Sequence, residues 1–262
     1  MSWTCPLPSY FLANYYRFFK NTRPFITNCQ RQAKALDNQK NLCIFAGKNQ
    51  ADMNNIKNIA FDLGGVVLAL SLEGAIRTFE KMGLTDARQR LDAFQQRGVF
   101  ADLESGRIDK EEFRQEMCRL IGREVTMQEC YDAWHGYVDH VPQRNLNVLQ
   151  QLRQKGYKVC LLSNTNPFMT MWTESPAFDG HGHPMSHYFD HLYLSYECGV
   201  MKPSPTIFHM MLEGQDALPE ETLFIDDSTV NVQAAQTLGI HTLCPQNNED
   251  WTLFPEIQAL LQ

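Results

Sequence analysis

Short apolar segments alternate with segments of helical periodicity along most of this chain, and this alternation limits the possible folds most strongly. After Pro142, amphipathic segments with leucines at helical spacing separate several apolar, β-branched segments. The expected strands cover residues 56–61, 157–162, 192–195, 222–225 and 240–243. Strands that are separated by helices favour a doubly wound parallel sheet, a Rossmann-like α/β core.

A long stretch between the first two strands carries helical signals only. Apolar residues recur at helical spacing between Ser71, a possible N-cap, and Gly83, a helix stop. Two capping boxes follow, Asp109-x-x-Glu112 and Thr126-x-x-Glu129. We therefore expect a small all-helical cap domain over residues 71–140, inserted into a core formed by residues 56–70 and 141–262.

The first 55 residues differ from the rest in charge. Residues 1–55 carry a net charge of +5, and residues 56–262 carry −12. Aromatic and basic residues cluster near the start, which is compatible with attachment to a membrane surface or an acidic partner. Two alternatives remain open: an unstructured extension, or a native start at Met53, directly before the first strand.

Composition and charge exclude several functional classes. The whole chain has a formal net charge of −7, whereas a general nucleic-acid binder would show a basic excess. No apolar segment approaches the roughly 20 residues of a membrane-spanning helix. We therefore expect no nucleic-acid partner and no transmembrane segment.

The cysteines form no C-x-x-C pair and no regular framework. They stand at positions 5, 29, 43, 118, 130, 160, 198 and 244. In a chain of this length, such a distribution indicates reduced thiols, several of them buried, and hence a cytoplasmic location.

Three polar clusters stand at the ends of three expected strands. They are Asp62, Ser163-Asn164 and Asp226-Asp227. A parallel sheet brings the carboxyl ends of its strands to one edge, where carboxylates would repel one another unless a cation lay between them. Oxygen ligands of this kind suit Mg²⁺. With Lys202 on a nearby loop, this set suits phosphoryl chemistry, which depends on charge neutralisation and positioning.

Each cluster also has an ordinary structural interpretation. A single Asp at a strand end is more often a turn former or a helix cap. Ser-Asn-Thr after a strand is a common turn, and Asp-Asp-Ser before a helix is a common N-cap. Their joint occurrence at corresponding strand ends favours a functional site, because independent turns have no reason to coincide there.

Four motifs in this order resemble those of the haloacid dehalogenase-like hydrolase superfamily. They are Phe61-Asp62-Leu63-Gly64-Gly65-Val66, Leu162-Ser163-Asn164-Thr165, Lys202-Pro203 with Ile207-Phe208, and Phe224-Ile225-Asp226-Asp227-Ser228. The resemblance covers about residues 56–245, and the helical insert is similar to the first cap type of that family. It implies a Mg²⁺-dependent phosphatase acting on a small phosphorylated metabolite.

The resemblance also implies a role for each matching residue. Asp62 would be the nucleophile that forms an aspartyl-phosphate. Ser163, with the Asn164 backbone nearby, would bind the phosphoryl group, and Lys202 would offset its charge. The Mg²⁺ ligands would be the Asp62 carboxylate, the Gly64 carbonyl and Asp227, with Asp226 direct or through water.

One position departs from the family pattern. Phosphatases of this family usually carry a second Asp two residues after the nucleophile, as general acid and base, and this chain has Gly64 there. The backbone carbonyl remains, but the proton donor does not. A group from the cap could replace it, the substrate could have a good leaving group, or the protein could be a weak enzyme that mainly binds.

This departure leaves a second function open, a pseudo-phosphatase that binds or senses a phosphorylated ligand. A metal-free dehalogenase is less favoured, because it would leave Asp226 and Asp227 without a cation.

Two further groups of residues are candidates for binding. Four histidines lie in an excursion after the second motif: His181, His183, His187 and His191. A zinc site is conceivable there, but no acidic or Cys partner stands at ligand spacing, so we expect a loop over the active-site edge. Eight arginines lie in the insert, and one or two of them could hold a substrate anion: Arg77, Arg88, Arg90, Arg97, Arg107, Arg114, Arg119 and Arg123.

Overall fold

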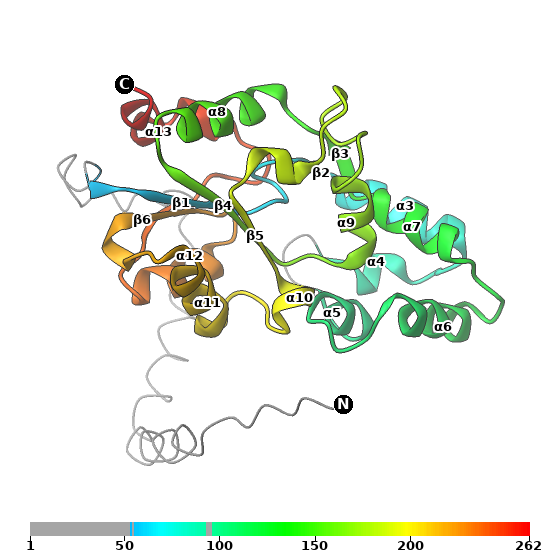
Figure 1. Ribbon diagram of the computed structural model, residues 1–262. Coiled ribbons are helices and arrows are strands. Elements are labelled where there is room, and N and C mark those ends of the chain that lie inside the picture. Colours follow the sequence, from blue (N-terminus) through cyan, green and yellow to red (C-terminus); the bar gives the residue numbers. More distant parts are fainter. Residues whose placement is uncertain (1–52, 54, 93–95) are drawn as a thin grey trace, which may run out of the picture. The chain divides into compact units, whose positions relative to one another are not determined.

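Five parallel strands form the central sheet of the computed structural model, which describes residues 53, 55–92 and 96–262 (Figure 1). The strand order is β5-β4-β1-β6-β7. The strands are β1 (Asn58–Phe61), β4 (Lys158–Ser163), β5 (His191–Leu194), β6 (Thr222–Ile225) and β7 (His241–Leu243). The expected doubly wound α/β core is confirmed.

The register aligns the carboxyl ends of the three middle strands. Phe61, the last residue of β1, pairs with Leu161 of β4 and with Ile225 of β6. The residues that follow these ends therefore emerge at the same edge of the sheet. Ligands of doubly wound sheets bind at this edge.

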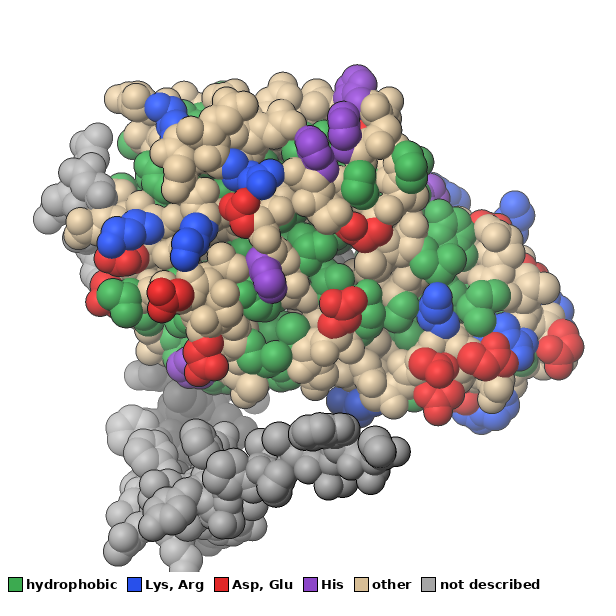
Figure 2. Space-filling view, viewed as in Figure 1, with side chains coloured by type: hydrophobic (Ala, Val, Ile, Leu, Met, Phe, Trp, Pro, Cys, Tyr) green, Lys and Arg blue, Asp and Glu red, His purple; other side chains and the backbone are tan. Residues whose placement is uncertain are grey.

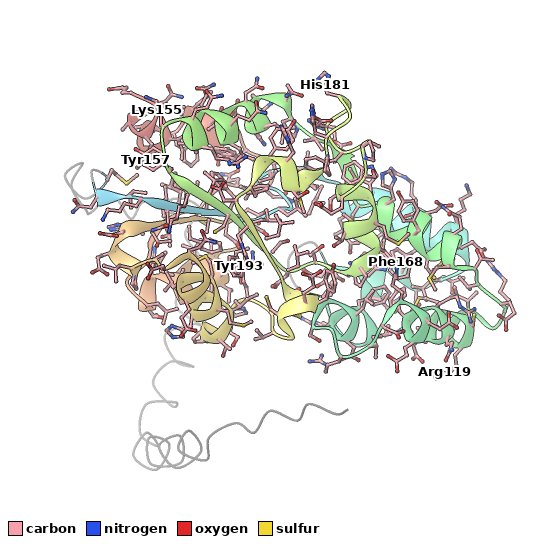
Figure 3. The ribbon with its side chains drawn as sticks, viewed as in Figure 1. Arg119, Lys155, Tyr157, Phe168, His181 and Tyr193 are labelled. Carbon is pink, nitrogen blue, oxygen red and sulfur yellow. The ribbon has the colours of Figure 1, made fainter. Side chains whose placement is uncertain are left out.

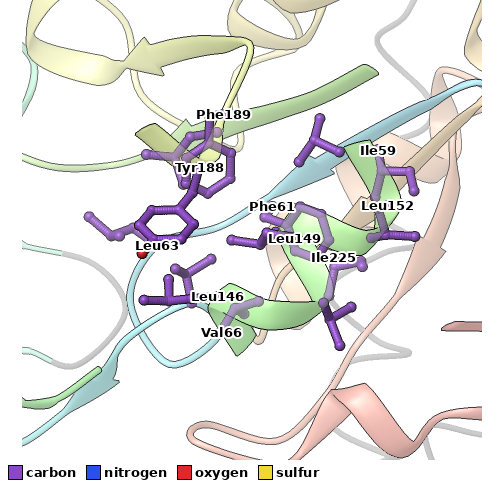
Figure 4. Packing of buried hydrophobic residues seen from close by; sticks show 14 of the residues in the cluster. Ile59, Phe61, Leu63, Val66, Leu146, Leu149, Leu152, Tyr188, Phe189 and Ile225 are labelled. Atoms are coloured by element: carbon purple, nitrogen blue, oxygen red, sulfur yellow. The ribbon is translucent and has the colours of Figure 1, made fainter. Parts of the chain in front are cut away.

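Side chains alternate between the two faces of the sheet, as the period of a strand requires. Ile59 and Phe61 of β1 belong to one hydrophobic cluster, together with Leu149 and Leu152 of helix α8 (Gln143–Gln154), which packs on this face of the sheet (Figure 4). Ala60, between them, belongs to the cluster on the opposite face. Both faces are therefore buried, which explains the almost continuous apolar character of these strands.

Helices cover both faces of the sheet. Figure 1 shows α8 and α13 on one side and α11 and α12 on the other. The helices of the core are α8 (Gln143–Gln154), α9 (Pro167–Thr173), α10 (Ser195–Cys198), α11 (Pro205–Gln215), α12 (Thr229–Thr237) and α13 (Pro255–Leu260). Three short 3₁₀ segments are η3 (Met185–Tyr188), η4 (Pro219–Glu221) and η5 (Trp251–Leu253).

The described part of the insert folds into five helices around its own hydrophobic cluster. They are α3 (Leu72–Met82), α4 (Ala87–Arg90), α5 (Val99–Glu104), α6 (Lys110–Ile121) and α7 (Met127–His135). Buried aromatic rings hold them together: Phe100 makes edge contacts with Phe79, Phe113 and Trp134. Phe168 of α9 completes this cluster, so α9 joins the core segment to the cap (Figure 3).

The expected helix starts are confirmed by their hydrogen bonds. The Ser71 hydroxyl accepts from the Gly74 N–H, so it caps α3. Asp109 and Thr126 each form a complete capping box at the start of α6 and α7. Each cap satisfies N–H groups that lack a partner within the helix.

A two-stranded antiparallel sheet lies at the boundary between the core and the cap, and the sequence pattern indicated no strand over residues 138–140. β2 (Ala69–Leu70) pairs with β3 (Val138–His140). β3 was missed because two of its three residues are exposed and polar, so it shows no apolar alternation. The expectation of a purely helical insert is therefore corrected for residues 138–140.

Four core strands differ slightly from the expected ranges, and the first of them, β1, begins at Asn58 rather than at Ile56. β4 and β5 each begin and end one residue away from the predicted bounds, and β7 begins at His241 rather than Ile240. The domain boundaries remain predictions, since all described residues belong to one compact unit. The extension, residues 1–55, lies outside the described residues except for Met53 and Asn55.

Two expectations from composition can be compared with the described residues. No described helix is long and apolar enough to cross a membrane. Four of the described cysteines are free thiols: Cys118, Cys130, Cys160 and Cys198.

Candidate active site

A lysine ammonium group links two carboxylates at the sheet edge. The Lys202 Nζ lies 2.9 Å from Asp62 Oδ1 and 2.7 Å from Asp226 Oδ2. It also donates to the Leu162 carbonyl oxygen at 2.7 Å. The Lys202 side chain is 0% exposed, so its charge depends on these oxygens in place of water.

Asp226 is held rigidly by groups on the next helix. Its Oδ1 accepts from the Ser228 N–H at 2.8 Å, and both carboxylate oxygens accept from Asn231 Nδ2 at 3.1 Å. With the Lys202 contact, every oxygen of this fully buried carboxylate has a donor. A buried charge needs such partners, and they fix Asp226 in one orientation.

Asp227 completes a group of three carboxylates. One oxygen from each of Asp62, Asp226 and Asp227 lies within 4.8 Å of the other two. Burial, and then the charges of Asp62 and Asp226, raise the pKa of Asp227 to about 8. Burial raises the pKa of Asp62 to about 6, although the Lys202 ammonium opposes this shift.

These carboxylates fit a divalent cation. Three hard oxygen ligands converge, and their mutual repulsion is what a cation would relieve. Burial alone lowers the pKa of Lys202, but Asp226 and Asp62 more than offset it and raise the pKa overall. Lys202 therefore stays charged, and it alone does not neutralise three carboxylates.

Gly64 lies at the junction of two adjoining cavities. The first is lined by Asp62, Asp227 and Lys202. The second extends toward the cap helices. Gly64, Leu70 and Asn164 line both. A Cβ atom added at Gly64 would lie 2.4 Å from Leu70 Cδ1, so Leu70 occupies the space that a side chain at position 64 would need.

Ser163 and Asn164 reach the site in different ways. Ser163 is buried and lines the second cavity. The Asn164 side chain, in contrast, binds the backbone of Lys202: its Oδ1 accepts from the Lys202 N–H at 2.8 Å, and its Nδ2 donates to the Lys202 carbonyl at 2.9 Å. Asn164 thus fixes the Lys202 loop in addition to bordering both cavities.

Glu104 faces the same region and was missed in the sequence. It is the last residue of α5, it is 7% exposed, and it lines the second cavity with Gly64 and Ser163. A weak signal existed, because Glu104 stands four positions after the buried Phe100 and so shares its helical face. Asn231 was missed too, since nothing in the sequence distinguishes it from an ordinary helix residue.

The histidine segment does not form a metal site. His183 Nδ1 lies 2.8 Å from the buried carboxylate of Asp179, four residues earlier, and its ring stacks on that of His187. An acidic partner is therefore present, contrary to our expectation, but Asp179 also accepts from Tyr188 Oη at 2.7 Å. Within the described ranges, only Asp62, Asp226 and Asp227 form a group of three possible ligands.

Most arginines of the cap are paired with carboxylates at its surface. Figure 2 shows basic and acidic side chains side by side over this part of the molecule. The paired arginines are Arg88, Arg90, Arg107, Arg114, Arg119 and Arg123. Arg119 lies at the end of the cap farthest from the sheet (Figure 3). None of the eight lines either cavity, so the described residues do not support an arginine clamp for the substrate.

Known proteins share this fold and much of this sequence. D-ribitol-5-phosphate phosphatase of Bacteroides thetaiotaomicron is 45% identical over 196 residues, which span 75% of this chain and 95% of that protein. A solved structure of a HAD-like family hydrolase from Porphyromonas gingivalis is 43% identical and matches with a TM-score of 0.74, covering 79% of this chain and 98% of that one.

A second solved structure is relevant to the cavity. It is a HAD family enzyme from Bacteroides thetaiotaomicron in complex with magnesium and inorganic phosphate, 38% identical, with a TM-score of 0.69. The match covers 76% of this chain and 99% of that chain.

The family model of haloacid dehalogenase-like hydrolases matches residues 56–239. This range includes all four motifs and the whole cap. It agrees with the parallel sheet and with the acidic residues at its carboxyl edge. The chain belongs to the haloacid dehalogenase-like hydrolases.

Proposed function

We propose that this protein is a Mg²⁺-dependent phosphatase that acts on a small phosphorylated metabolite through an aspartyl-phosphate. The observation that carries this proposal is the convergence of Asp62, Asp226 and Asp227 on one cavity with the buried Lys202. A phosphoric monoester hydrolase agrees with the name of the relative that is 45% identical. Magnesium agrees with the neighbour solved with that ion and phosphate.

The residues of this chain have distinct tasks in the proposed reaction. A carboxylate oxygen of Asp62 attacks phosphorus and displaces the alcohol oxygen. Lys202 offsets the negative charge of the attacking carboxylate and of the phosphoryl oxygens. The Ser163 hydroxyl donates to one phosphoryl oxygen. Water then attacks the phosphoryl group, which regenerates Asp62 and releases inorganic phosphate.

The carboxylates and the Gly64 carbonyl would hold the Mg²⁺. This ion would neutralise charge on the phosphoryl oxygens. A dehalogenase needs no such cation, and the raised pKa of Asp227 is what an unmatched third carboxylate would show. The acidic cluster therefore favours phosphoryl transfer over dehalogenation.

The substrate class follows from the second cavity. It joins the phosphate side at Gly64 and carries polar side chains among apolar ones, including Gln96, Tyr137 and Asn166. The Asn166 Nδ2 is buried and has no hydrogen-bond partner among the described residues. Such a wall suits a leaving group with hydroxyls. D-ribitol 5-phosphate, a sugar alcohol phosphate, is the first compound to test.

A binding or regulatory role is the second candidate, and Gly64 is the observation that favours it. Without the usual acid, the protein could bind a phosphorylated ligand with Mg²⁺ and not turn it over.

A substrate screen separates the two. Purified protein is assayed for phosphate release from sugar alcohol phosphates, sugar phosphates, nucleotides, acyl phosphates and 4-nitrophenyl phosphate, with Mg²⁺ and with EDTA. The phosphatase proposal expects turnover that EDTA abolishes and added Mg²⁺ restores. Mg²⁺-dependent stabilisation by a ligand without turnover would establish the binding role instead. Turnover that is unaffected by EDTA would contradict the metal site.

The raised carboxylate pKa values predict how stability depends on pH. Between its ordinary pKa of 3.8 and about 8, Asp227 keeps a proton in the folded protein that the unfolded chain has lost. The unfolded state then binds fewer protons, so stability falls as pH rises through this window. Asp62 adds to the effect up to about pH 6.

We therefore expect the Tm of the metal-free protein to fall as pH rises from about 5 to about 8. The fall should be smaller in the Asp227→Asn variant, which carries no charge at that position. Mg²⁺ should raise the Tm more at the higher pH, because it competes with protons for the carboxylates. Calorimetry at both pH values measures this, and an equal Mg²⁺ shift in the variant would contradict it.

A further inference from the structure

The end of the Leu70 side chain lies beside Gly64, at the position where a Cβ atom would stand. Leu70 fills the space beside Gly64, so no side chain could replace the acid from this position without displacing it. Alcohol leaving groups need a proton as the bond to phosphorus breaks, and a positioned acid typically contributes about 10²–10⁴-fold to such a step. A donor must therefore approach from another direction.

Glu104 is the carboxyl group that the cap places there. It lines the second cavity, whose wall includes Gly64 and Ser163, and this cavity adjoins the one that contains Asp62. A phosphate bound near Asp62 and Lys202 would direct its leaving group past Gly64 into this second cavity. No described side chain or backbone group donates a hydrogen bond to the Glu104 carboxyl, although the residue is only 7% exposed.

We propose that Glu104 is the general acid and base of the reaction, in place of the missing second Asp; this rests on the proposed phosphatase function. In the first step, Asp62 forms its bond to phosphorus and the phosphorus–oxygen bond of the ester breaks. The leaving oxygen takes the proton of Glu104 and departs as an alcohol. In the second step, the Glu104 carboxylate accepts a proton from water as this water attacks phosphorus, and Asp62 leaves as a carboxylate.

The environment of Glu104 suits an acid. Burial, and then the negative charge of Asp62, raise the pKa of Glu104 to about 8. The other titratable groups that line the two cavities are Tyr137, whose own pKa is raised by burial, and Lys202 and Asp227 on the far side of Gly64. Near neutral pH the carboxyl therefore holds the proton that the leaving group requires.

The fold also fixes the position of Glu104 against the sheet. The Ser195 hydroxyl, which is completely buried, donates to the Glu104 carbonyl at 2.6 Å and accepts from the Thr165 N–H at 3.0 Å. This hydroxyl connects the end of α5 to the loop after β4. Two residues on, Gly106 has φ of +69°, and a Cβ there would lie 2.2 Å from the Tyr196 carbonyl oxygen. The cap therefore meets the core closely beside the proposed acid.

The test compares leaving groups in the full-length Glu104→Gln variant. Glutamine has the size and the neutral charge of the protonated carboxyl, so the Tm should stay near that of the wild type. With an alkyl phosphate, the rate of the first step should fall about 10²–10⁴-fold. With 4-nitrophenyl phosphate, whose leaving group needs no proton, the first step should keep its rate. The second step should be slow, which gives a burst of nitrophenolate followed by slow turnover.

Asp102→Asn is the matched control on the same helix. Its carboxylate is half-exposed and pairs with Arg107, so both steps should keep their rates. An equal loss on alkyl and aryl phosphates in the first step of Glu104→Gln, or no loss on either substrate, would overturn the assignment of Glu104.

Restoring the acid at its usual position gives an independent test. Gly64→Asp with Leu70→Ala removes the clash at 2.4 Å and supplies a carboxyl beside Asp62. In the Glu104→Gln background, these two changes should raise the rate with an alkyl phosphate at least about tenfold. If the triple variant folded but its alkyl phosphatase rate did not recover, the loss in Glu104→Gln would not be due to a missing acid. The two proposals fail differently. If the wild-type protein hydrolyses no phosphate ester, the phosphatase function is wrong. If Glu104→Gln hydrolyses alkyl phosphates at the normal rate, only the role of Glu104 as general acid and base is wrong.

Discussion

Asp62→Asn should reduce phosphate release from every substrate to background. The amide cannot act as the nucleophile, and enzymes that use a covalent intermediate lose roughly 10⁴-fold or more when the nucleophile is removed. Because burial already favours the neutral form of Asp62, the neutral amide should be tolerated in the fold. Steady-state kinetics with an alkyl and an aryl phosphate would measure the loss.

A matched carboxylate serves as control for this variant. Asp139 of β3 is exposed, and its carboxylate pairs with the exposed His140 ring, so Asp139→Asn should keep full activity. If Asp62→Asn kept more than about a tenth of the wild-type rate while Asp139→Asn behaved as expected, Asp62 would not be the nucleophile.

Lys202→Met should have the second largest effect, on stability as well as on rate. The ammonium group lies between Asp62, Asp226 and a backbone carbonyl with no exposed surface. Its removal leaves the carboxylates buried without their partner, and breaking a buried pair in this way costs about 3–5 kcal/mol. Urea unfolding at neutral pH should show this loss, and phosphatase activity should fall with it.

Two comparisons make the Lys202 result specific. Lys155→Met changes an exposed lysine after α8 and should alter the free energy of unfolding by no more than about 0.5 kcal/mol. Mg²⁺ should stabilise Lys202→Met more than the wild type, because without the ammonium group the cation is the only positive charge that offsets the carboxylates. A loss below about 1 kcal/mol in Lys202→Met would show that the carboxylates do not need this ammonium group.

The parallel core and the acidic edge could be predicted from the sequence for a specific physical reason. A strand that is buried on both faces is apolar throughout, so the first polar residue marks its end. The parallel register then brings these ends together, as the pairing of Phe61 with Leu161 and Ile225 shows. Asp62, Asp226 and Asp227 could therefore be brought into one site without coordinates.

The remaining parts of the site depend on contacts that no local pattern records. The position of Leu70 beside Gly64 requires the β2–β3 pairing, and β3 has too few apolar residues to be recognised. Glu104 reaches the second cavity only because α5 docks on α10 through Ser195. Such placements follow from packing between distant segments, which periodicity and capping signals do not encode.

The distribution of charge gains a structural meaning. Part of the −12 of residues 56–262 lies in three carboxylates at one edge of the sheet, which Lys202 offsets only in part. The cap contributes both signs, largely in surface ion pairs. The net charge of residues 56–262 is thus compatible with a cation in the cavity that contains Asp62 and with a protonated Glu104 in the second cavity.

Chemical trapping of the intermediate tests the central claim most directly. Wild-type protein is quenched with borohydride during turnover of 4-nitrophenyl phosphate with Mg²⁺, because borohydride reduces an acyl phosphate to an alcohol. Peptide mass spectrometry should then find homoserine at position 62, and only aspartate there when EDTA replaces Mg²⁺. Turnover with unmodified Asp62, or with the reduced residue at another position, would contradict an aspartyl-phosphate mechanism at this site.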